Sequence, residues 1–572
     1  MQCDASVTEN ASFGQALAER IEARVDRIAA SPIASLAAIL VVAFLAFLPG
    51  FSSLPPIDRD EPRFAQATRQ MIETGNYFDI RFQDEARYKK PIGIYWLQAA
   101  AVTLTGGGGE APIFLYRLPS FVGGIAMAML TWWLAMAFGN PRRALLAGMM
   151  VAATILVGVE ARLAKTDMVL LVTITAMHGA LARAWLDRTG ERSMRRAAIF
   201  WTALAASILI KGPVGFGAVL CPLIGLCLVE GSAGWLRRLR PLAGLLWTLI
   251  LVAPWFIAIG LASRGAFYSD SLGQDFLQKI GSAQESHGAP PGTYALVVIF
   301  TFWPIAAFFL AGLGALMDRL RQPLVLYVAL SVIPYWLVIE AVPTKLPHYA
   351  LPLFPLLALA SAYLVDGDHL QRASRHGLMR FFALSAMLMP LALAVVGLVL
   401  TLLLGEAMAW AGFAMLVLSA ATGFLSARLW PRSSIAAALT AILAALITYA
   451  GVFGLILPSF EQVRLSGRLV AAAHALASCP HPILASAGYG EPSLVFLGGT
   501  NLRLIDGERA ATFLAEGGCR VAFVEEGEMH AFRSRADDLG LTPKDGGLVR
   551  GFNLNSGRFL SLHVFLPPKA SP

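Results

Sequence analysis

The chain has 572 residues, of which 57% are hydrophobic and only 14% are charged, whereas a soluble globular protein carries roughly 25% charged residues. This composition excludes a soluble enzyme and predicts a protein that crosses the membrane many times. The formal net charge of +8 would suggest nucleic acid in a soluble protein. Here the basic residues lie in short loops between apolar runs, as the positive-inside rule requires of cytoplasmic loops, so no nucleic-acid partner is predicted.

The first 32 residues are polar and predict a cytoplasmic segment, amphipathic or flexible, with no cleavable signal peptide. Arg20, Arg24 and Arg27 precede the first apolar run, 33–51, so that this run begins in the cytoplasm. The polar segment 52–111 is then predicted to lie outside. Its apolar stretch 92–104 is only about 13 residues long, too short for a confident membrane span. It predicts a juxtamembrane helix at the outer surface.

The arginine-rich loops fix the direction of every later apolar run. Counting 92–104 as a span would place every later basic loop outside, so the arginine pattern excludes that reading. The sequence thus predicts about thirteen spans in the segment 33–457: 33–51, 112–138, 144–159, 168–185, 197–210, 214–229, 242–261, 294–316, 324–339, 350–365, 381–404, 407–425 and 435–457. Of these, 197–210 is the weakest because it is short even for a tilted helix.

The segment 458–572 has ordinary polarity and predicts a small α/β domain on the outer face. Short apolar runs at 482–485, 521–524 and 559–562 predict strands, and helical stretches are predicted at 464–477 and 508–515. The domain holds Cys479 and Cys519, which could form a disulfide in an oxidising compartment or stay unpaired. No metal-binding motif is evident.

Charged residues of the predicted outer loops are the candidates for chemistry. Lysines outside run against the positive-inside bias, and a bound anion is one reason for them. Lys90, Lys211 and Lys345 each stand near the membrane boundary beside a proline, at the depth of a lipid phosphate. The outer-loop candidates are Asp58, Asp60, Glu61, Arg63, Lys89, Lys90, Glu160, Lys165, Asp167, Lys211, His287, Lys345 and His348.

Each of these signals also has a structural explanation. Asp60 and Glu61 before Pro62 form a good helix start, so Asp60 could be only a helix cap. Asp167 could likewise cap the span that follows it. The lysines could extend toward lipid headgroups, and His287 could be an ordinary loop histidine. Together the signals are stronger, because carboxylates, lysines and an arginine all fall on one side of the membrane.

Several of these motifs, in this order, resemble the GT-C glycosyltransferases. Asp60-Glu61-Pro62-Arg63 in a long first outer loop looks like their acidic signature. Four further motifs are similar to the branch that contains the lipid A aminoarabinose transferase, which sits beside the protein O-mannosyltransferases: Lys90-Pro91 with Tyr95-Trp96-Leu97, Asp167-Met168, Lys211-Gly212-Pro213, and Lys345-Leu346-Pro347-His348-Tyr349. The resemblance implies a membrane-embedded catalytic domain over 33–457 and a periplasmic α/β domain over 458–572.

The resemblance also implies residue roles. Asp60 matches the catalytic carboxylate, and Arg63, Lys90 and Lys211 match positions that hold the phosphate of a polyprenyl-phosphate sugar. Tyr349 matches a tyrosine near that phosphate, and Asp167 matches the second acidic position. From their place in the outer loops, Lys345 is a further candidate for the phosphate, and Glu61, His287 and His348 are candidates for positioning sugar or acceptor. Lys89 before Lys90 and Ile92 after Pro91 depart from the aminoarabinose pattern, so the sugar and the acceptor stay open.

The predicted activity is inverting transfer of one sugar from a polyprenyl-phosphate donor to an acceptor outside the cytoplasm, at the bacterial inner membrane. Asp60 is the predicted base, with Asp58 as the alternative. The acceptor is lipid A, lipopolysaccharide or another envelope glycan, with protein O-mannosylation as the second possibility. No nucleotide is expected, and a divalent metal is neither required nor excluded. A transporter or lipid flippase is the rival from another class, but transporters place charges at mid-membrane and often show inverted repeats.

Overall fold

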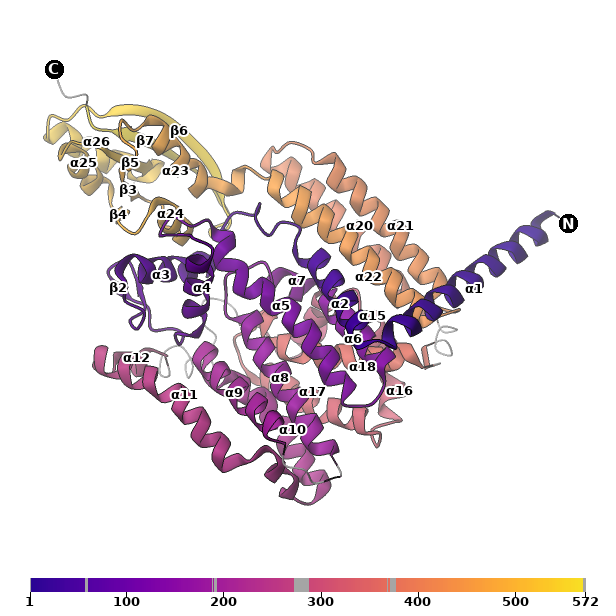
Figure 1. Ribbon diagram of the computed structural model, residues 1–572. Helices are drawn as coiled ribbons and strands as arrows, with labels where there is room; N and C mark the ends of the chain where they lie inside the picture. The colour runs from indigo at the N-terminus through magenta and orange to yellow at the C-terminus, as the bar shows by residue number, and fades with distance from the viewer. Residues whose placement is uncertain are drawn as a thin grey trace.

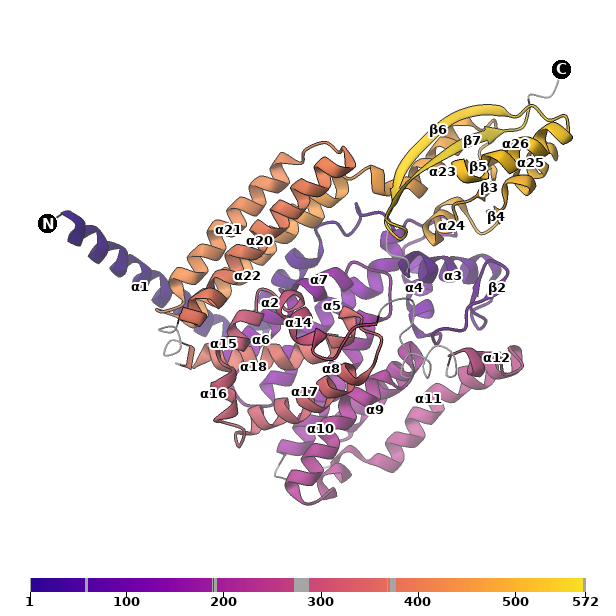
Figure 2. The same ribbon diagram turned by 180° about the vertical axis from the view of Figure 1, so that it is seen from behind.

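The computed structural model describes residues 2–568 except 57–59, 188, 190–192, 272–287, 368 and 371–376, with side chains described from residue 15 on apart from 377–381. The chain forms a helical bundle and a smaller α/β domain at its C-terminal end (Figures 1 and 2). The N-terminal helix α1 (Gln2–Ala29) projects away from the bundle. The predicted fold class, a helical membrane protein with a C-terminal α/β domain, is thereby confirmed.

The bundle helices begin where the sequence supplies a cap followed by helix-forming residues. Ser31 precedes α2 (Pro32–Phe47), and its hydroxyl accepts a hydrogen bond from the amide of Ala34. Asn140 does the same for α6 (Pro141–Ala152) through Arg143, 3.0 Å away. The proline that follows each cap fits the first helical turn, where no amide partner is needed. The other bundle helices are α5 (Ile113–Met136), α7 (Ile155–Glu160), α8 (Asp167–Leu186), α9 (Met194–Lys211), α10 (Val214–Glu230), α11 (Pro241–Ala262), α12 (Ala266–Tyr268), α14 (Thr293–Thr301), α15 (Ala306–Ala311), α16 (Leu313–Met317), α17 (Pro323–Ala341), η3 (Pro347–Leu353), α18 (Phe354–Asp366), α20 (Gly377–Leu404), α21 (Trp410–Leu429) and α22 (Ser434–Gly451).

Eight described helical segments are long and apolar enough to span a membrane, or nine if the pair α1 and α2, bent by 116°, counts as one span. The predicted number of thirteen is not confirmed. The run 144–159 is divided between α6 and α7, and 294–316 is divided among α14, α15 and α16. Helix α10 has only 17 residues, and α9 carries Arg195, Arg196 and Lys211. A hydropathy pattern reports apolar length but not where a helix breaks.

The predicted cytoplasmic loops meet one another in space. Asp366 at the end of α18 accepts hydrogen bonds from Arg142 (2.6 Å) and Arg143 (2.7 Å), and Arg142 also donates to Asp26 of α1 (2.9 Å). Asp187 and Arg196, on both sides of the next basic loop, are paired at 2.7 Å. The N-terminal segment, the loop at 140–143 and the end of α18, which the arginine pattern assigned to one side of the membrane, therefore meet in space.

The first outer segment holds two short helices and a hairpin. Helix α3 (Glu61–Thr74) is followed by strands β1 (Arg81–Phe82) and β2 (Glu85–Ala86) and by α4 (Gly93–Leu104). The 12-residue α4 confirms the prediction of a short helix over 92–104. A Cβ atom on Gly93 would lie 2.8 Å from the carbonyl oxygen of Leu209, so only glycine allows α4 to approach the end of α9 this closely.

The C-terminal domain is a five-stranded sheet of order β4-β3-β5-β7-β6 with helices on both faces. Strands β3 (Ile483–Ala487), β5 (Arg520–Glu525) and β7 (Arg558–Leu566) confirm the three predicted strands, and α23 (Leu465–Leu476) and α25 (Gly507–Ala515) confirm the two helices. Strands β4 (Arg503–Ile505) and β6 (Lys544–Asn553) and helices α24 (Pro492–Gly498) and α26 (Met529–Asp538) complete it. Strand β3 is parallel to β4 and β5, whereas β7 is antiparallel to β5 and β6. Alternate residues of β3 and β5 fill two separate cores, one on each face.

This domain is fastened to α3 by side-chain hydrogen bonds. Arg69 donates to the carbonyl of Phe496 (2.9 Å), and Gln66 donates to the hydroxyl of Thr500 (2.8 Å), which in turn donates to Glu73 (2.6 Å). Gln83 after the first strand of the hairpin donates to the carbonyl of Thr500 as well (3.1 Å). Helix α3 and the C-terminal domain are thus held in one fixed arrangement.

A disulfide joins Cys479 and Cys519, the pairing that the sequence left open. It closes a loop of 40 residues, so its loss should destabilise the domain by about 2–4 kcal/mol. We expect the double variant Cys479→Ser/Cys519→Ser to unfold at a lower temperature in a thermal melt. Cys221→Ser, which removes a free cysteine of α10, should leave that transition in place. Free thiols at both 479 and 519 in peptides from the unreduced protein would contradict this assignment.

Candidate active site

Asp60 stands at the start of α3, as the sequence predicts. It occupies the N-cap position, but its side chain makes no capping hydrogen bond, and 59% of that side chain is exposed. Arg63, one turn further on, approaches the Asp60 carboxylate to 4.0 Å and is itself partly buried. The Asp60 carboxylate is therefore exposed at the start of α3 and does not act as the side-chain cap of that helix. Asp58, the alternative base, lies outside the described residues.

Glu61 has a different role from the one predicted. Its side chain is fully buried, and Arg117 of α5 donates to both carboxylate oxygens, at 2.7 and 2.9 Å. The amide of Ala164 donates to the first of these oxygens, at 2.9 Å. The prediction that Glu61 positions a sugar or an acceptor is therefore wrong, because the carboxylate is enclosed and its oxygens already accept hydrogen bonds. Glu61 instead holds the start of α3 in place.

Asp167 and Lys211 meet at the outer ends of α8 and α9. The Lys211 ammonium donates to a carboxylate oxygen of Asp167 at 2.6 Å, and both side chains are largely shielded from solvent. Chain reversal after Lys211 depends on Gly212, whose φ of +65° favours glycine. The two residues come from separate loops in the sequence, and the fold brings them together.

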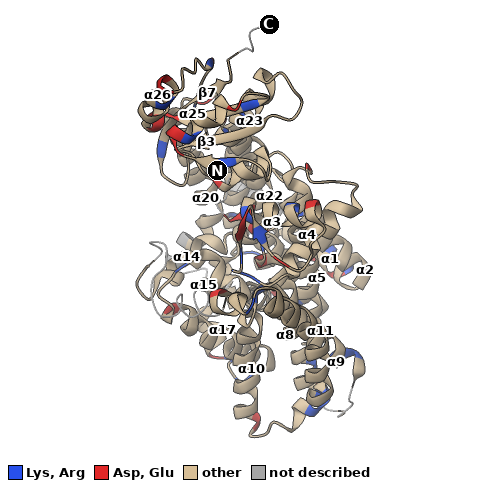
Figure 3. Ribbon diagram, turned by 90° about the vertical axis from the view of Figure 1, so that its left-hand side faces the viewer, with Lys and Arg blue, Asp and Glu red and all other residues tan. Residues whose placement is uncertain are grey.

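His348 joins this cluster from η3. It interacts electrostatically with Asp167, Lys211, Lys165 and Asp60, which places four of the predicted outer loops near one another. The ring of Tyr349 lies edge-on to that of His348 with centroids 5.0 Å apart. Figure 3 shows acidic and basic segments together below α3, whereas α8, α10, α11 and α17 are almost without charge.

Lys345 is not available for a phosphate. Its ammonium donates to three carbonyl oxygens at the end of α17, those of Ile339 (3.0 Å), Glu340 (2.5 Å) and Val342 (2.7 Å). An ammonium has three donors, so all of them are used. The predicted phosphate contact is therefore wrong: Lys345 caps the C-terminal end of α17, where the helix dipole favours a positive charge.

Lys90 lies on the segment that leads into α4, and its ammonium donates to the carbonyl of Lys89 at 3.1 Å. The close approach of Gly93 to Leu209 described above joins this segment to the last turn of α9, two residues before Lys211. Lys90 and Lys211 thus come from neighbouring elements at the same outer boundary. His287 lies outside the described residues.

Two arginines of the site were missed by sequence reasoning. Arg117 looked like part of an apolar span, although an arginine there needs a counter-ion, and Glu61 is that counter-ion. Arg87 is 91% buried over the ring of Phe64, with 5.1 Å between guanidinium carbon and ring centroid. Its Nε–H has no hydrogen-bond acceptor among the described residues. Phe64 lies one turn after Asp60, so Arg87 packs against the first turns of α3, the helix that begins next to the candidate base.

Among the described residues, no group of three or more His, Cys, Asp and Glu side chains could hold a metal ion. The expectations that neither a metal nor a nucleotide is needed stay predictions. The arrangement consists of one exposed carboxylate with several cations at one end of the helical bundle. Such a site can accept a proton from a hydroxyl group while it stabilises a phosphate that leaves.

Comparisons with known proteins agree with this architecture. The profile of the dolichyl-phosphate-mannose-protein mannosyltransferase family matches residues 89–257. The undecaprenyl phosphate-alpha-4-amino-4-deoxy-L-arabinose arabinosyl transferase of Pectobacterium carotovorum is 26% identical over 313 residues, 54% of this chain and 55% of that protein. An uncharacterized protein of Aquifex aeolicus is 25% identical over 318 residues, 55% of this chain and 60% of that protein. The alignments span little more than half the length of these curated relatives.

The crystal structure of ArnT from Cupriavidus metallidurans bound to undecaprenyl phosphate superimposes with a TM-score of 0.72, covering 93% of this chain and 97% of that one at 18% identity. The shared fold includes the membrane bundle and the C-terminal domain, since nearly all of both chains is covered. The chain therefore has the fold of the Cupriavidus protein and is similar in sequence to aminoarabinose transferases, which agrees with the resemblance drawn from the sequence.

Proposed function

We propose that the protein is an inverting glycosyltransferase that moves one sugar from a polyprenyl-phosphate donor to an acceptor outside the cytoplasm. The observation that carries the proposal is the convergence of Asp60, Arg63, Lys90 and Lys211 at the outer boundary of the bundle. The fold supports it, because the Cupriavidus protein of this fold was solved with undecaprenyl phosphate. Related arabinosyl transferases are named for a donor of the same class.

The donor lies with its polyprenyl chain in the bilayer and its phosphate among the cations. Arg63, Lys90 and Arg87 are the groups that neutralise the phosphate. Asp167 accepts one ammonium proton of Lys211 and thereby orients this side chain toward the ligand. The two remaining ammonium protons of Lys211 can bind the phosphate. Tyr349 and His348 flank the same point.

Transfer then needs one proton movement and one displacement. Asp60 accepts the proton of the acceptor hydroxyl, whose oxygen attacks the anomeric carbon of the sugar. The bond between that carbon and the phosphate oxygen breaks, and its electron pair leaves with the phosphate. The cations stabilise the negative charge that grows on the phosphate. Attack opposite the leaving group inverts the anomeric configuration.

The acceptor we propose is lipid A, lipopolysaccharide or another envelope glycan, and the location is the bacterial inner membrane with the site facing the periplasm. The basic loops lie on the opposite side from α3 in the topology set by the positive-inside rule. The Cys479–Cys519 disulfide is of the kind that persists in an oxidising compartment such as the periplasm. The match to the mannosyltransferase family profile favours protein O-mannosylation as the second candidate function.

The test is transfer from a panel of synthetic polyprenyl-phosphate sugars, each radiolabelled in the sugar, by the purified protein in liposomes that contain envelope glycolipids or an unfolded peptide. Labelled glycolipid supports the first acceptor class, and labelled peptide supports protein O-mannosylation. No labelled product from any donor with either acceptor, although the protein is folded, would contradict the proposal.

Lys90 provides a separate test of the phosphate contact. Because its ammonium neutralises a phosphate, Lys90→Ala should raise the KM for the donor by about tenfold or more, as loss of a hydrogen bond to a charged group costs about 1.5–3 kcal/mol. The adjacent and exposed Lys89 is the matched control, and Lys89→Ala should leave the donor KM within twofold. Equal effects of the two substitutions would mean that only the general positive charge of the segment matters.

A further inference from the structure

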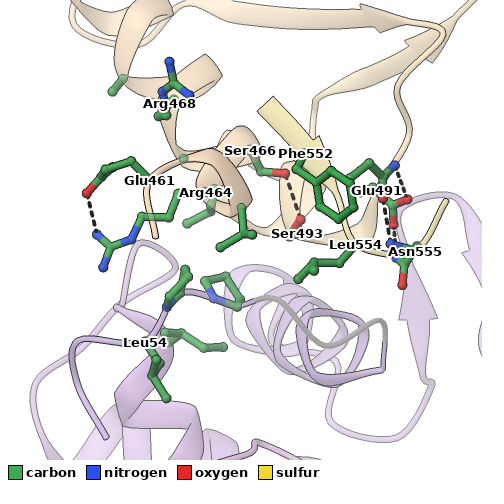
Figure 4. Close-up of a pocket in the computed structure, with 18 of the residues that line it drawn as sticks. Leu54, Glu461, Arg464, Ser466, Arg468, Glu491, Ser493, Phe552, Leu554 and Asn555 are labelled. Atoms are coloured by element: carbon green, nitrogen blue, oxygen red, sulfur yellow. Dashed lines mark hydrogen bonds and ion pairs between the residues drawn. The ribbon is translucent and has the colours of Figure 1, made fainter. Parts of the chain in front are cut away.

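A pocket lies between the C-terminal domain and the start of the first outer segment (Figure 4). It has a volume of about 380 Å³, within the range of roughly 300–1,000 Å³ that is usual for small-molecule sites. Its floor is the loop 52–56 of the membrane domain, and its walls are α23, the start of α24 and the turn between β6 and β7. The mechanism proposed above uses none of these residues.

One wall combines a carboxylate, two amides and an aromatic ring. Asn553 and Asn555 donate to the two carboxylate oxygens of Glu491, at 3.0 and 2.5 Å. The ring of Phe552 stands beside them in Figure 4. Each carboxylate oxygen keeps a further lone pair. Hydroxyl groups can therefore bind to this polar edge while the C–H face of a ring packs on Phe552, a combination that suits a sugar.

The middle of the pocket is lined by hydroxyl groups. Ser466 bonds to the hydroxyls of both Tyr489 and Ser493, at 2.8 Å each. Burial raises the pKa of Tyr489 to about 12, so its phenol is neutral and acts as donor or acceptor at physiological pH. Because the hydrogen of such a hydroxyl group can rotate, the group can either donate a hydrogen bond to a ligand hydroxyl or accept one from it.

The opposite wall carries charges that cancel. Arg464 donates to the carbonyls of Ser53 and Pro458, and Arg468 donates to the carbonyl of Arg550. Glu461 lies 3.8 Å from Arg464. The lining therefore holds two arginines and two glutamates, Glu461 and Glu491, and the arginines are tied to the backbone of both domains. This balance favours an uncharged ligand over a phosphate or a carboxylate.

The floor of the pocket is close to the candidate base along the chain. Pro56 precedes Asp60 by four residues, and a chain of that length spans at most about 14 Å even when it is fully extended. Because α3 is fastened to the C-terminal domain through Arg69 and Gln66, this separation is held fixed. A ligand in the pocket can thus belong to the same molecule whose hydroxyl reaches Asp60.

We infer that this pocket is an acceptor subsite that binds a neutral sugar residue of a glycan acceptor, one or more residues away from the hydroxyl that receives the new sugar. The inference rests on the proposed function, since it assumes that an acceptor approaches Asp60. The inference gives the C-terminal domain a role in acceptor recognition. It also requires the acceptor to be a glycan rather than a molecule that offers only an isolated hydroxyl group.

The kinetic test uses Phe552→Ala and Asn555→Ala, with Leu548→Ala, an exposed residue of the same strand β6, as the matched control. We expect the two pocket substitutions to raise the KM for a glycan acceptor roughly tenfold, to leave the donor KM within twofold, and to lose their effect with an acceptor trimmed to a single sugar. Leu548→Ala should match the wild type. Unchanged acceptor KM values in both pocket variants of an active enzyme would overturn the inference.

A binding measurement separates this inference from the proposed function. Saturation-transfer NMR would be recorded on the full-length protein in a detergent without a sugar headgroup, with mannose, glucose, galactose, N-acetylglucosamine and their disaccharides as probes. Binding that disappears in Phe552→Ala but persists in Leu548→Ala supports the pocket. If the protein then transfers sugar from none of the donors, the transferase proposal alone fails. Absence of binding by any probe, together with unchanged kinetics, overturns the pocket and leaves the transferase proposal standing.

Discussion

Replacing Asp60 with asparagine is expected to abolish measurable sugar transfer while the protein still folds. The side chain is 59% exposed and makes no capping hydrogen bond, so the amide of asparagine fits the same space at little cost in stability. It cannot accept the acceptor proton, and general base catalysis contributes roughly 10²–10⁴-fold to rate. We expect kcat to fall by at least about 10²-fold with the donor KM nearly unchanged, measured with the labelled donor.

The matched control is Asp84→Asn, the same change at an exposed aspartate of the β1–β2 turn, which should retain wild-type kcat. Asp58→Asn addresses the alternative base. If Asp58→Asn is inactive and Asp60→Asn is fully active, the base is assigned to the wrong residue of the loop. Equal thermal melts of all three variants and the wild type would show that the losses arise from chemistry.

Replacing Arg117 with alanine is expected to produce the largest loss of stability. Its guanidinium donates to Glu61 and also to the carbonyls of Phe51 (3.0 Å), Leu54 (2.8 Å) and Pro55 (3.2 Å), so it ties the segment 51–55 to the start of α3. Removing one partner of a buried ion pair leaves an uncompensated charge and costs about 3–5 kcal/mol. We expect a clearly lower unfolding temperature in detergent and a loss of activity through misplacement of α3.

The partly exposed pair Arg81–Asp79, at 2.9 Å with 47% of the arginine and 16% of the aspartate side chain exposed, is the control. Arg81→Ala should cost no more than about 1 kcal/mol, because solvent screens such pairs. The double variant Glu61→Gln/Arg117→Met should recover part of the stability, since it leaves no buried charge. A melt of Arg117→Ala that coincides with that of Arg81→Ala would contradict the structural role given to the Glu61–Arg117 pair.

The grouping of basic loops on one side could be predicted from the sequence, whereas the number of spans could not, because the charge of a loop acts locally. Each basic loop reports its side of the membrane by itself, and the contacts of Asp366 with Arg142 and Arg143 are what that assignment requires. The breaks at α6–α7 and α14–α16 could not be predicted. They depend on how neighbouring helices pack, and mean apolarity over 20 residues carries no information about that.

The site could be predicted only in part. The position of Asp60 and the meeting of Asp167, Lys211 and His348 agree with the predicted outer loops. The roles predicted for Glu61 and Lys345 were wrong, because a charged residue in a loop looks the same in the sequence whether it faces a ligand or a buried partner. The partner of Glu61 is 56 residues away, and the acceptors of Lys345 are backbone carbonyls, which leave no signature in the side-chain sequence.

The transporter reading is less well supported by this arrangement. Transporters hold their functional charges near the middle of the bilayer. Three charged residues of the site stand instead at helix ends: Asp60, Asp167 and Lys211. These ends lie on the side of the bundle where α3 and the C-terminal domain are found. Charges at the boundary suit a reaction on a lipid phosphate, which lies at that depth.

The fate of the donor lipid tests the proposed sugar transfer most directly. Wild-type protein in liposomes would be supplied with a polyprenyl-phosphate sugar and a glycan acceptor, and the lipid products would be followed by mass spectrometry beside Asp60→Asn. We expect wild type to convert the donor to free polyprenyl phosphate in a one-to-one ratio with glycosylated acceptor, and Asp60→Asn to form neither. Donor that stays intact across the whole sugar panel, or that moves between the leaflets without losing its sugar, would contradict the proposal.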